Sequence, residues 1–228
     1  VVETLMGQGM RVACCARRED RLADLADRVS NADGDLLTAT VDLRKERDIL
    51  SFFERVRDTW GGVDVLINNA GLGHAMPLAE GETEKWREML DVNVLALAVC
   101  TREVLRDLRR RKVSGHIIHI SSMAAHRVPS GSGMYSATKY AVRALTEALR
   151  QELRAEGSKT RVTALSPGFV QTEFAEKFHD DPSAAAKAYD QFPVLTPKDI
   201  AEQVRFVLSQ PAHVQIHDIL TRPTEQGS

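Results

Sequence analysis

The fold class follows from an apolar run that ends in a polar loop, Val63-Asp64-Val65-Leu66-Ile67-Asn68-Asn69-Ala70-Gly71. The same pattern returns twice, in Ile117-Ile118-His119-Ile120-Ser121-Ser122 and in Val162-Thr163-Ala164-Leu165-Ser166-Pro167-Gly168. Short apolar runs of this kind are typical of buried strands in a parallel sheet. Because site residues of parallel sheets collect where the strands end, we expect functional side chains at these polar ends.

Stretches with helical spacing lie between the strands. Ile49, Phe53 and Val56 recur at helical intervals, and Gly61-Gly62 ends that helix before the next strand. The predicted strands cover residues 11–15, 36–41, 63–67, 116–121, 161–166 and 214–220, and the predicted helices cover 19–29, 45–60, 83–112, 135–156 and 200–208, with a helical insertion through 188. Strands that alternate with helices predict an α/β fold: a doubly wound parallel sheet (Rossmann fold) in three α-β-α layers, forming one domain over residues 1–228.

Composition and charge exclude several function classes. The 228 residues are 43% hydrophobic and 27% charged with a net charge of -2, so neither nucleic acid nor a membrane surface is an expected partner. The basic run Arg109-Arg110-Arg111-Lys112 could form a binding patch, but it falls at a predicted helix C-terminus, where cations complement the dipole. Histidines and cysteines show no metal-ligand spacing, so we expect no metal. A cytoplasmic location is expected, with a signal ahead of the first residue left open.

Tyr135 and Lys139 are the strongest candidates for chemistry. They are four residues apart in Tyr135-Ser136-Ala137-Thr138-Lys139, which puts a phenol and an ammonium on one face of a predicted helix. A phenol has an ordinary pKa of ~10, and a nearby cation favours its charged form. We therefore expect Lys139 to lower the pKa of Tyr135 towards neutrality, where proton transfer is efficient. The alternative is an ordinary pair on a helix surface.

Together with these two residues, three further motifs resemble the short-chain dehydrogenase/reductase family. The motifs are Asn68-Asn69-Ala70-Gly71, Asn93 within Asp91-Val92-Asn93-Val94, and Ser122 thirteen residues before Tyr135. The resemblance covers the chain from its first residues to its C-terminus. It implies an oxidoreductase that transfers a hydride between a nicotinamide cofactor and a carbonyl or secondary alcohol.

The resemblance also implies a role for each catalytic position. Tyr135 would protonate the carbonyl oxygen as the hydride arrives, Lys139 would hold the nicotinamide ribose, and Ser122 would bind the substrate oxygen. Asn93 would hold a water that leads protons to Lys139, the alternative being a helix-interior amide that bonds to backbone. We prefer Ser122 to Ser121 because the interval of thirteen residues from Ser122 to Tyr135 matches the family, and we expect Ser121 to face the other way.

The cofactor that these residues imply is NADP(H). NAD-dependent relatives end the second strand with an acid, whereas this chain has Cys15-Ala16-Arg17-Arg18 there. Guanidinium groups suit a 2′-phosphate, so we expect Arg17 as the main ligand and Arg18 as a second one. The alternative is that both arginines are solvated residues at a helix start. The resemblance implies further cofactor contacts: Asp42 and Leu43 at the adenine, Asn69, Ala70 and Gly71 beneath the adenosine, Tyr135 and Lys139, and Pro167, Gly168, Val170 and Thr172 at the nicotinamide.

One element of the family pattern has no counterpart in this sequence. The family opens with a strand and a glycine-rich turn, Thr-Gly-x-x-x-Gly-x-Gly, whereas Val1-Val2-Glu3-Thr4-Leu5-Met6 resembles the helix after that turn. We therefore expect an N-terminally truncated domain that lacks the first strand. In the order 3-2-1-4-5-6 that strand is central, so two neighbours would be left unpaired.

The expected substrate is a small apolar carbonyl compound or alcohol, because Phe174, Phe178 and Tyr189 follow the nicotinamide segment. Three stretches are similar to the dehydrogenase/reductase SDR family member 11 group: residues 135–142, 214–219 and 222–226. That resemblance implies NADPH-dependent reduction of keto-steroids or reactive dicarbonyls, and an insect-type farnesol dehydrogenase, with an isoprenoid substrate, is another relative. The sequence does not rank these substrates.

Two function classes stay open. One is an NADP(H)-dependent carbonyl reductase or alcohol dehydrogenase; the other is a catalytically inactive truncated form that acts only as a dimer partner or is an unstable fragment. A regulatory nucleotide-binding module is disfavoured, because such modules commonly lose the tyrosine and lysine. In this family the long helices, here 85–112 and 135–156, commonly pack against their twins, so we expect a homodimer or homotetramer. The small residues Ala137, Ala141, Ala144 and Ala148 would allow close approach, or pack within the chain.

Overall fold

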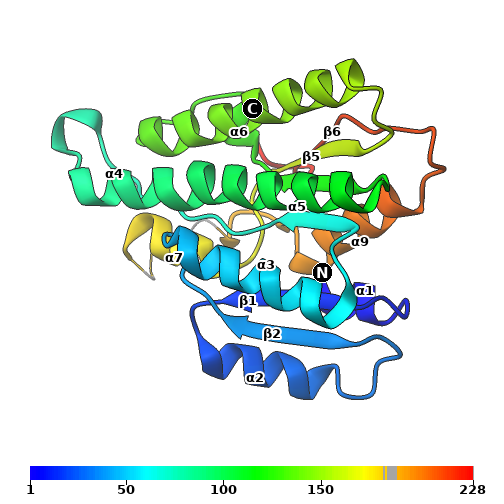
Figure 1. The fold of residues 1–228 in the computed structure, drawn as a ribbon. Coiled ribbons are helices and arrows are strands. Elements are labelled where there is room, and N and C mark those ends of the chain that lie inside the picture. Colours follow the sequence, from blue (N-terminus) through cyan, green and yellow to red (C-terminus); the bar gives the residue numbers. More distant parts are fainter. Residues whose placement is uncertain (182, 184–188, 228) are drawn as a thin grey trace.

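The computed structural model describes residues 1–181, 183 and 189–227, and Figure 1 shows their arrangement. Within these residues the strands form two sheets, ordered β1-β2 and β3-β4-β5-β6, and every pairing inside them is parallel. The strands are β1 (Val12–Ala16), β2 (Leu36–Thr40), β3 (Val65–Asn68), β4 (His116–Ile120), β5 (Arg161–Pro167) and β6 (Asp218–Thr221). The parallel α/β fold expected from the sequence is therefore confirmed.

Helices connect the strands and cover them. They are α1 (Val2–Met6), α2 (Glu19–Arg28), α3 (Glu46–Trp60), α4 (Thr83–Leu90), α5 (Leu97–Arg111), α6 (Gly133–Ala155), α7 (Phe174–His179) and α9 (Pro197–Ser209). Two short 3-10 helices, η1 (Leu78–Glu80) and η3 (Met123–Ala125), and the π-helix η2 (Asp91–Ala96) complete the described elements. The helical insertion predicted through residue 188 begins with α7, and residues 184–188 of that prediction lie outside the described residues.

The larger sheet is buried between two apolar layers. Ile117 and Ile118 are adjacent in β4 and fully buried, and they point to opposite faces. On the face of Ile117 lie apolar side chains of α3, α5 and α6, and on the face of Ile118 lie those of α1 and α9. Figure 1 shows β1 and β2 at the opposite end of the molecule from α6, next to α2. The three α-β-α layers place the carboxyl ends of the parallel strands at one edge, where the site is built.

β1 and β3 each have one edge without a strand partner in the described part of the chain. β1 pairs with β2 and β3 pairs with β4, and no ladder joins the two sheets there. This is the arrangement expected when the central strand of the doubly wound order is lacking. The consequence is a large cavity whose walls include residues of both strands.

Polar contacts stabilise the ends of two helices, and one of them confirms the predicted place of the basic run at a helix C-terminus. The basic run lies in the last turn of α5, where Arg109 pairs with Glu156 and Arg111 with Asp64. Thr196 caps α9 in a capping box with Asp199, with proline in the first turn.

No helix in the described residues is long and apolar enough to span a membrane.

The last strand is shorter than predicted at its start. It begins at Asp218 rather than near Val214. Side chains of β5 hold this stretch instead of a ladder: Arg161 Nη1 donates to the Val214 carbonyl oxygen at 3.3 Å, and Thr163 Oγ1 donates to the Ile216 carbonyl oxygen at 2.7 Å. Because these carbonyl oxygens accept hydrogen bonds from side chains, the stretch before β6 need not pair as a regular strand. Apolar periodicity alone does not reveal this.

Candidate active site

Ser122, Tyr135 and Lys139 line one cavity of about 1480 Å³, which is lined along β1 and β3 and includes residues after the carboxyl ends of β3, β4 and β5. Ser122 follows β4 and begins η3, where its Oγ accepts a hydrogen bond from the Ala124 amide at 3.0 Å. Tyr135 and Lys139 lie on α6, and both side chains are buried. Lys139 Nζ lies 5.9 Å from the centroid of the Tyr135 ring, so the two groups share a face of the helix as their spacing predicts.

Lys139 is a buried cation with a backbone acceptor. Its Nζ donates to the Ile120 carbonyl oxygen at 3.0 Å, at the last residue of β4. Burial lowers the pKa of Lys139 to about 8, because an ammonium group loses hydration there. A methyl group at Gly71 would lie 3.4 Å from Nζ and 3.5 Å from Asn93 Oδ1. The loop after β3 therefore passes directly over the two polar groups.

Tyr135 differs from the expectation for its acidity. Burial raises its pKa to about 12, and a hydrogen bond with Ser122 lowers it without offsetting the burial. The phenol is covered by the rings of Phe174 and Phe178, whose centroids lie 5.4 and 5.5 Å from its own. Meanwhile the ammonium of Lys139 bonds to a carbonyl oxygen. The expected shift towards neutrality is therefore wrong for this state, because desolvation of the phenolate exceeds the stabilisation it receives.

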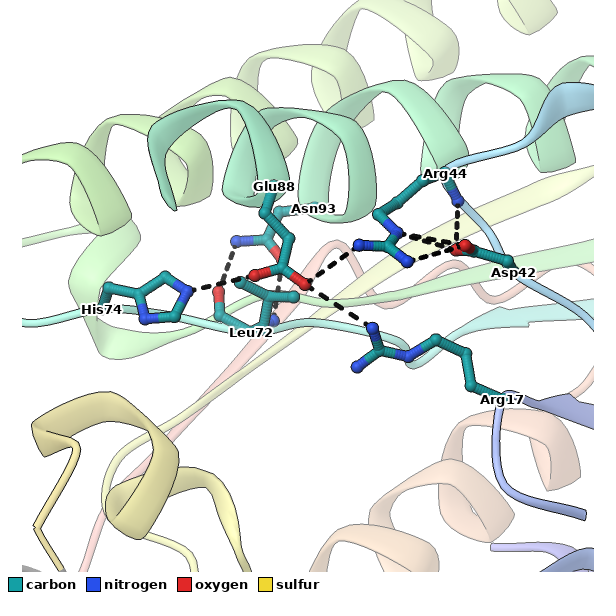
Figure 2. Close-up of polar contacts among 7 residues, drawn as sticks. All are labelled: Arg17, Asp42, Arg44, Leu72, His74, Glu88 and Asn93. Atoms are coloured by element: carbon teal, nitrogen blue, oxygen red, sulfur yellow. Dashed lines mark hydrogen bonds and ion pairs between the residues drawn. The ribbon is translucent and has the colours of Figure 1, made fainter. Parts of the chain in front are cut away.

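Asn93 fixes the loop after β3 to α6. Its Oδ1 accepts from the Leu72 amide at 2.9 Å, and its Nδ2 donates to the Leu72 carbonyl oxygen at 2.7 Å (Figure 2). Asn93 Nδ2 also donates to Thr138 Oγ1 of α6 at 3.0 Å. The residue lies in the π-helix η2 and is buried. Its amide thus bonds to backbone, as the alternative interpretation held, but to the backbone of the site loop rather than of its own helix. The role in holding a water stays a prediction.

Ser121 was expected to face away from the site, yet it lines the same cavity as Ser122. β4 ends at Ile120, so the alternation of strand side chains no longer applies to the two serines. The Ser121 hydroxyl is buried and has no hydrogen-bond partner among the described residues. A buried hydroxyl of this kind has an unused donor and an unused acceptor beside the catalytic candidates.

All residues expected to contact a cofactor line this cavity except Arg17 and Asp42. Arg17 instead forms an ion pair with Glu88 of α4 at 3.5 Å, and Asp42 is held by Arg44, with 2.7 Å between Oδ2 and Nη2 (Figure 2). The hydrogen bond from Arg44 lowers the pKa of Asp42 to about 2. Asp42 is therefore an acceptor already engaged by a neighbour, rather than a free carboxylate pointing into the cavity.

Arg18 lines the cavity and is also paired. Its guanidinium contacts Glu173 through two hydrogen bonds of 2.8 and 3.3 Å, and Arg21 and Lys177 contact the same carboxylate. Glu173 precedes α7, whose phenylalanines cover Tyr135. Sequence reasoning missed both Glu88 and Glu173. Neither lies in a motif, and only the folded chain brings them next to the paired arginines.

A dinucleotide fits what the described residues offer. The cavity is lined by Arg18, by the loop 69–71 and by Tyr135 and Lys139, and its backbone at Gly71 and Gly168 carries no side chain. A Cβ atom at Gly168 would lie 2.2 Å from Gln226 Oε1 and 2.9 Å from Arg222 Cβ, so only glycine fits there. Close backbone approach combined with a cationic end is the surface that a phosphorylated dinucleotide requires.

Comparison with known proteins assigns the family. The model of the short chain dehydrogenases matches residues 1–183. The chain is 52% identical to dehydrogenase/reductase SDR family member 11 of Bos taurus, over 99% of this chain and 91% of that protein, and 37% identical to farnesol dehydrogenase of Aedes aegypti, over 98% and 89%. Among solved structures, the closed form of serine dehydrogenase complexed with NADP+ matches with a TM-score of 0.89 at 34% identity, covering 98% of this chain and 89% of that one. The chain belongs to the short-chain dehydrogenase/reductase family.

Proposed function

We propose that the protein is an NADP(H)-dependent oxidoreductase that interconverts a carbonyl and a secondary alcohol on a small apolar substrate. The observation that carries this proposal is the convergence of Ser122, Tyr135 and Lys139 on one cavity, with Asn93 behind the loop that closes it. These are the hydroxyl, the acid and the cation that carbonyl reduction requires. Membership of a family of oxidoreductases supports the same reaction class.

In this mechanism the chain's residues hold and deliver a proton. NADPH, when bound, supplies the hydride. Ser122 donates a hydrogen bond to the substrate oxygen, and Tyr135 transfers its phenolic proton to that oxygen as negative charge develops there. A pKa of about 12 keeps Tyr135 neutral at pH 7, which is the form that donates. Reduction therefore starts from the protonated phenol at pH 7, and the reverse oxidation starts from the phenolate.

NADP(H) rather than NAD(H) is proposed as the cofactor. β1 ends at Ala16 with arginines at the next two positions, so no acid follows the strand to bond a ribose 2′-hydroxyl. The similarity to a serine dehydrogenase solved with NADP+ supports this choice. Arg17 and Arg18 are the proposed 2′-phosphate ligands, each after exchanging its present carboxylate partner for the phosphate.

An apolar substrate is proposed from the aromatic wall of the cavity. Phe174 and Phe178 stack with ring centroids 5.5 Å apart against Tyr135, and Phe169 stacks with Phe192 at 6.3 Å. Tyr189 serves differently from the expectation, because its hydroxyl donates to the Val170 carbonyl oxygen at 2.9 Å and so fixes the segment after β5. A keto-steroid, a dicarbonyl and an isoprenoid-like compound remain the substrate candidates that the family resemblance supplies.

We also propose a cytoplasmic homodimer or homotetramer joined through the long helices. Ala137, Ala144 and Ala148 are exposed on α6, and Ala141 is half-buried, so this stripe of small residues does not pack into the chain's own core. Tyr140 and Leu145 are exposed beside it. Apolar and small residues on one exposed helix face favour close packing of a second copy.

The proposed reaction is tested by Tyr135→Phe, with Tyr140→Phe on the same helix as the matched control. NADPH oxidation is followed with a keto-steroid, a dicarbonyl and an isoprenoid ketone. Loss of a general acid typically costs about 10²–10⁴-fold in rate, so we expect that loss for Tyr135→Phe and none for Tyr140→Phe. Turnover that survives in Tyr135→Phe would rule out the assigned acid.

A second candidate, an inactive form that serves only as a partner in an oligomer, is favoured by the unpaired edges of β1 and β3. NADPH titration of the wild-type chain discriminates the two. Binding seen as a thermal shift together with turnover supports the enzyme, whereas an oligomer that neither binds NADPH nor turns over any of the three carbonyl compounds supports the inactive form.

A further inference from the structure

Glu88 lies at the meeting point of three loops that follow strands. Arg17 comes after β1, Arg44 after β2 and His74 after β3, and all three side chains reach the same carboxylate of α4 (Figure 2). Glu88 Oε1 lies 3.5 Å from Arg17 Nη1 and 3.6 Å from Arg44 Nη1, and Oε2 lies 3.2 Å from His74 Nε2. The carboxylate of Glu88 thus lies among side chains from three loops at the carboxyl ends of the strands. This is the edge of the sheet where the fold binds phosphorylated ligands.

The three partners of Glu88 are not equivalent. Arg44 is also chelated by Asp42, which accepts from its Nε, its Nη2 and its backbone amide. Arg17, in contrast, has Glu88 as its one ion-pair partner in the described part of the chain, and its side chain is 53% exposed. The Arg17 contact is longer than a hydrogen bond. The Arg44–Glu88 contact is equally loose at 3.6 Å, but Asp42 holds Arg44 in place. Arg17 is therefore the partner of Glu88 that can turn to a competing anion.

Loss of the Arg17–Glu88 ion pair leaves no buried charge unpaired. If Arg17 turns to another anion, Glu88 keeps Arg44 and the hydrogen bond to His74. An ion pair with an exposed partner contributes little to stability, so its loss costs little. A phosphate offers Arg17 a bidentate partner with more charge than a carboxylate. A ribose hydroxyl offers neither, so it leaves the Arg17–Glu88 pair in place.

We propose that Glu88 is a specificity-determining residue: an internal anion held by Arg17 that a 2′-phosphate displaces and a 2′-hydroxyl does not. This proposal rests on the NADP(H) function proposed above and deepens it. Because the 2′-phosphate must compete with Glu88 for Arg17, the phosphorylated dinucleotide binds more weakly than it would to an Arg17 without this partner. Removing the charge of Glu88 strengthens binding of a 2′-phosphate and leaves binding of the unphosphorylated nucleotide unchanged.

The test uses 2′,5′-ADP and 5′-ADP as probes, titrated calorimetrically into the full chain. Glu88→Gln keeps the shape of the side chain and its hydrogen bond to His74. Glu84→Gln is the matched control, because Glu84 lies on the same helix and pairs only with Arg87 among the described residues. We expect Glu88→Gln to tighten 2′,5′-ADP binding by about two- to five-fold, the worth of an exposed ion pair, and 5′-ADP binding to stay unchanged. Glu84→Gln should alter neither.

Unchanged or weaker 2′,5′-ADP binding in Glu88→Gln would overturn the competition, since Glu88 would then orient Arg17 instead. Arg17→Gln separates this failure from a failure of the proposed function. If wild type prefers 2′,5′-ADP and Arg17→Gln loses the preference, the NADP(H) assignment holds whatever Glu88 does. If wild type shows no preference for 2′,5′-ADP, both the cofactor assignment and the role of Glu88 are wrong.

Discussion

Single residues of the site show what spacing can and cannot predict. The four-residue interval of Tyr135 and Lys139 places both side chains on one face of α6, as helix geometry predicts. Ser122 lines the same cavity because it follows the end of β4. The direction of the Tyr135 pKa does not follow from local geometry, because it depends on Phe174 and Phe178 closing over the ring from a distant segment. Likewise the carboxylates that hold Arg17 and Arg18 lie far away in sequence and carry no motif.

Lys139 carries a prediction about stability and pH. Its native pKa of about 8 lies below the ordinary 10.5, so between these values the unfolded chain binds more protons than the native one. The free energy of unfolding therefore rises with pH across this window, and the burial cost is full below pH 8. Lys139→Met should remove this cost at pH 7, worth at most about 3 kcal/mol, less about 1 kcal/mol for the donor lost by Ile120. The same change should abolish turnover.

Urea unfolding at pH 7 and pH 9.5 measures this difference, and Tyr135 is present in both proteins, so its own titration cancels in the comparison. The stability advantage of Lys139→Met over wild type should shrink at pH 9.5, where most of the native wild-type Lys139 has lost its proton while the unfolded chain still binds it. Lys85→Met serves as the control, because Lys85 is an ordinary surface lysine of α4 paired with Glu82. An advantage that grows with pH would contradict the assigned direction of the shift.

At the scale of elements, apolar periodicity predicted most helices and strands to within a few residues, as α3, α6 and β5 show. The π-helix η2 was not predicted, because one widened turn leaves no mark on the apolar pattern, yet it carries Asn93. The position of α7 over the site was also beyond the sequence. It is set by contacts between α7 and the loop after β3, such as the hydrogen bond from the Ala75 amide to the Phe178 carbonyl oxygen at 2.7 Å.

Gly73 carries a prediction for the contact between this loop and α7. A Cβ atom there would lie 2.7 Å from Phe178 Cδ2, 2.8 Å from Tyr135 Cδ2 and 3.0 Å from Phe174 Cζ. Gly73→Ala should therefore push the aromatic cluster apart and destabilise the protein by about 1–3 kcal/mol, the usual cost of overpacking. Thermal or urea unfolding measures it. Gly133→Ala is the control, because its Cβ would meet only Leu78 at 3.6 Å or more.

A double-mutant cycle with Phe178→Ala identifies the cause. Removing the ring makes room for the alanine methyl group, so the two changes together should cost less than the sum of the single changes by about 0.5–3 kcal/mol. Strict additivity would mean that the cost of Gly73→Ala does not come from its contact with Phe178. The contacts with Tyr135 and Phe174, or the backbone, would then account for it.

At the scale of the whole molecule, the alternation of elements predicted the parallel sheet, but the cavity between the two sheets could be found only in the folded chain. β4 and β5 are almost entirely buried, whereas every residue of β1 and β2 is half-buried or exposed. The β1-β2 sheet has one edge open to the cavity, and no ladder in the described residues ties it to β3. Local stability follows burial and hydrogen bonding, so the two sheets should open at different free energies.

Hydrogen exchange measured by mass spectrometry tests this difference. We expect amides of β1 and β2 to exchange through local opening well before those of β4 and β5, which should exchange only on global unfolding. NADPH at 100 times its dissociation constant should raise the free energy of unfolding by about 2.7 kcal/mol, if it binds only the native state. Because the cavity is lined by both sheets, the ligand should slow exchange in β1 as well as around Tyr135. Protection confined to the larger sheet would mean that the cofactor does not bridge them, and the arginines after β1 would then have no part in holding it.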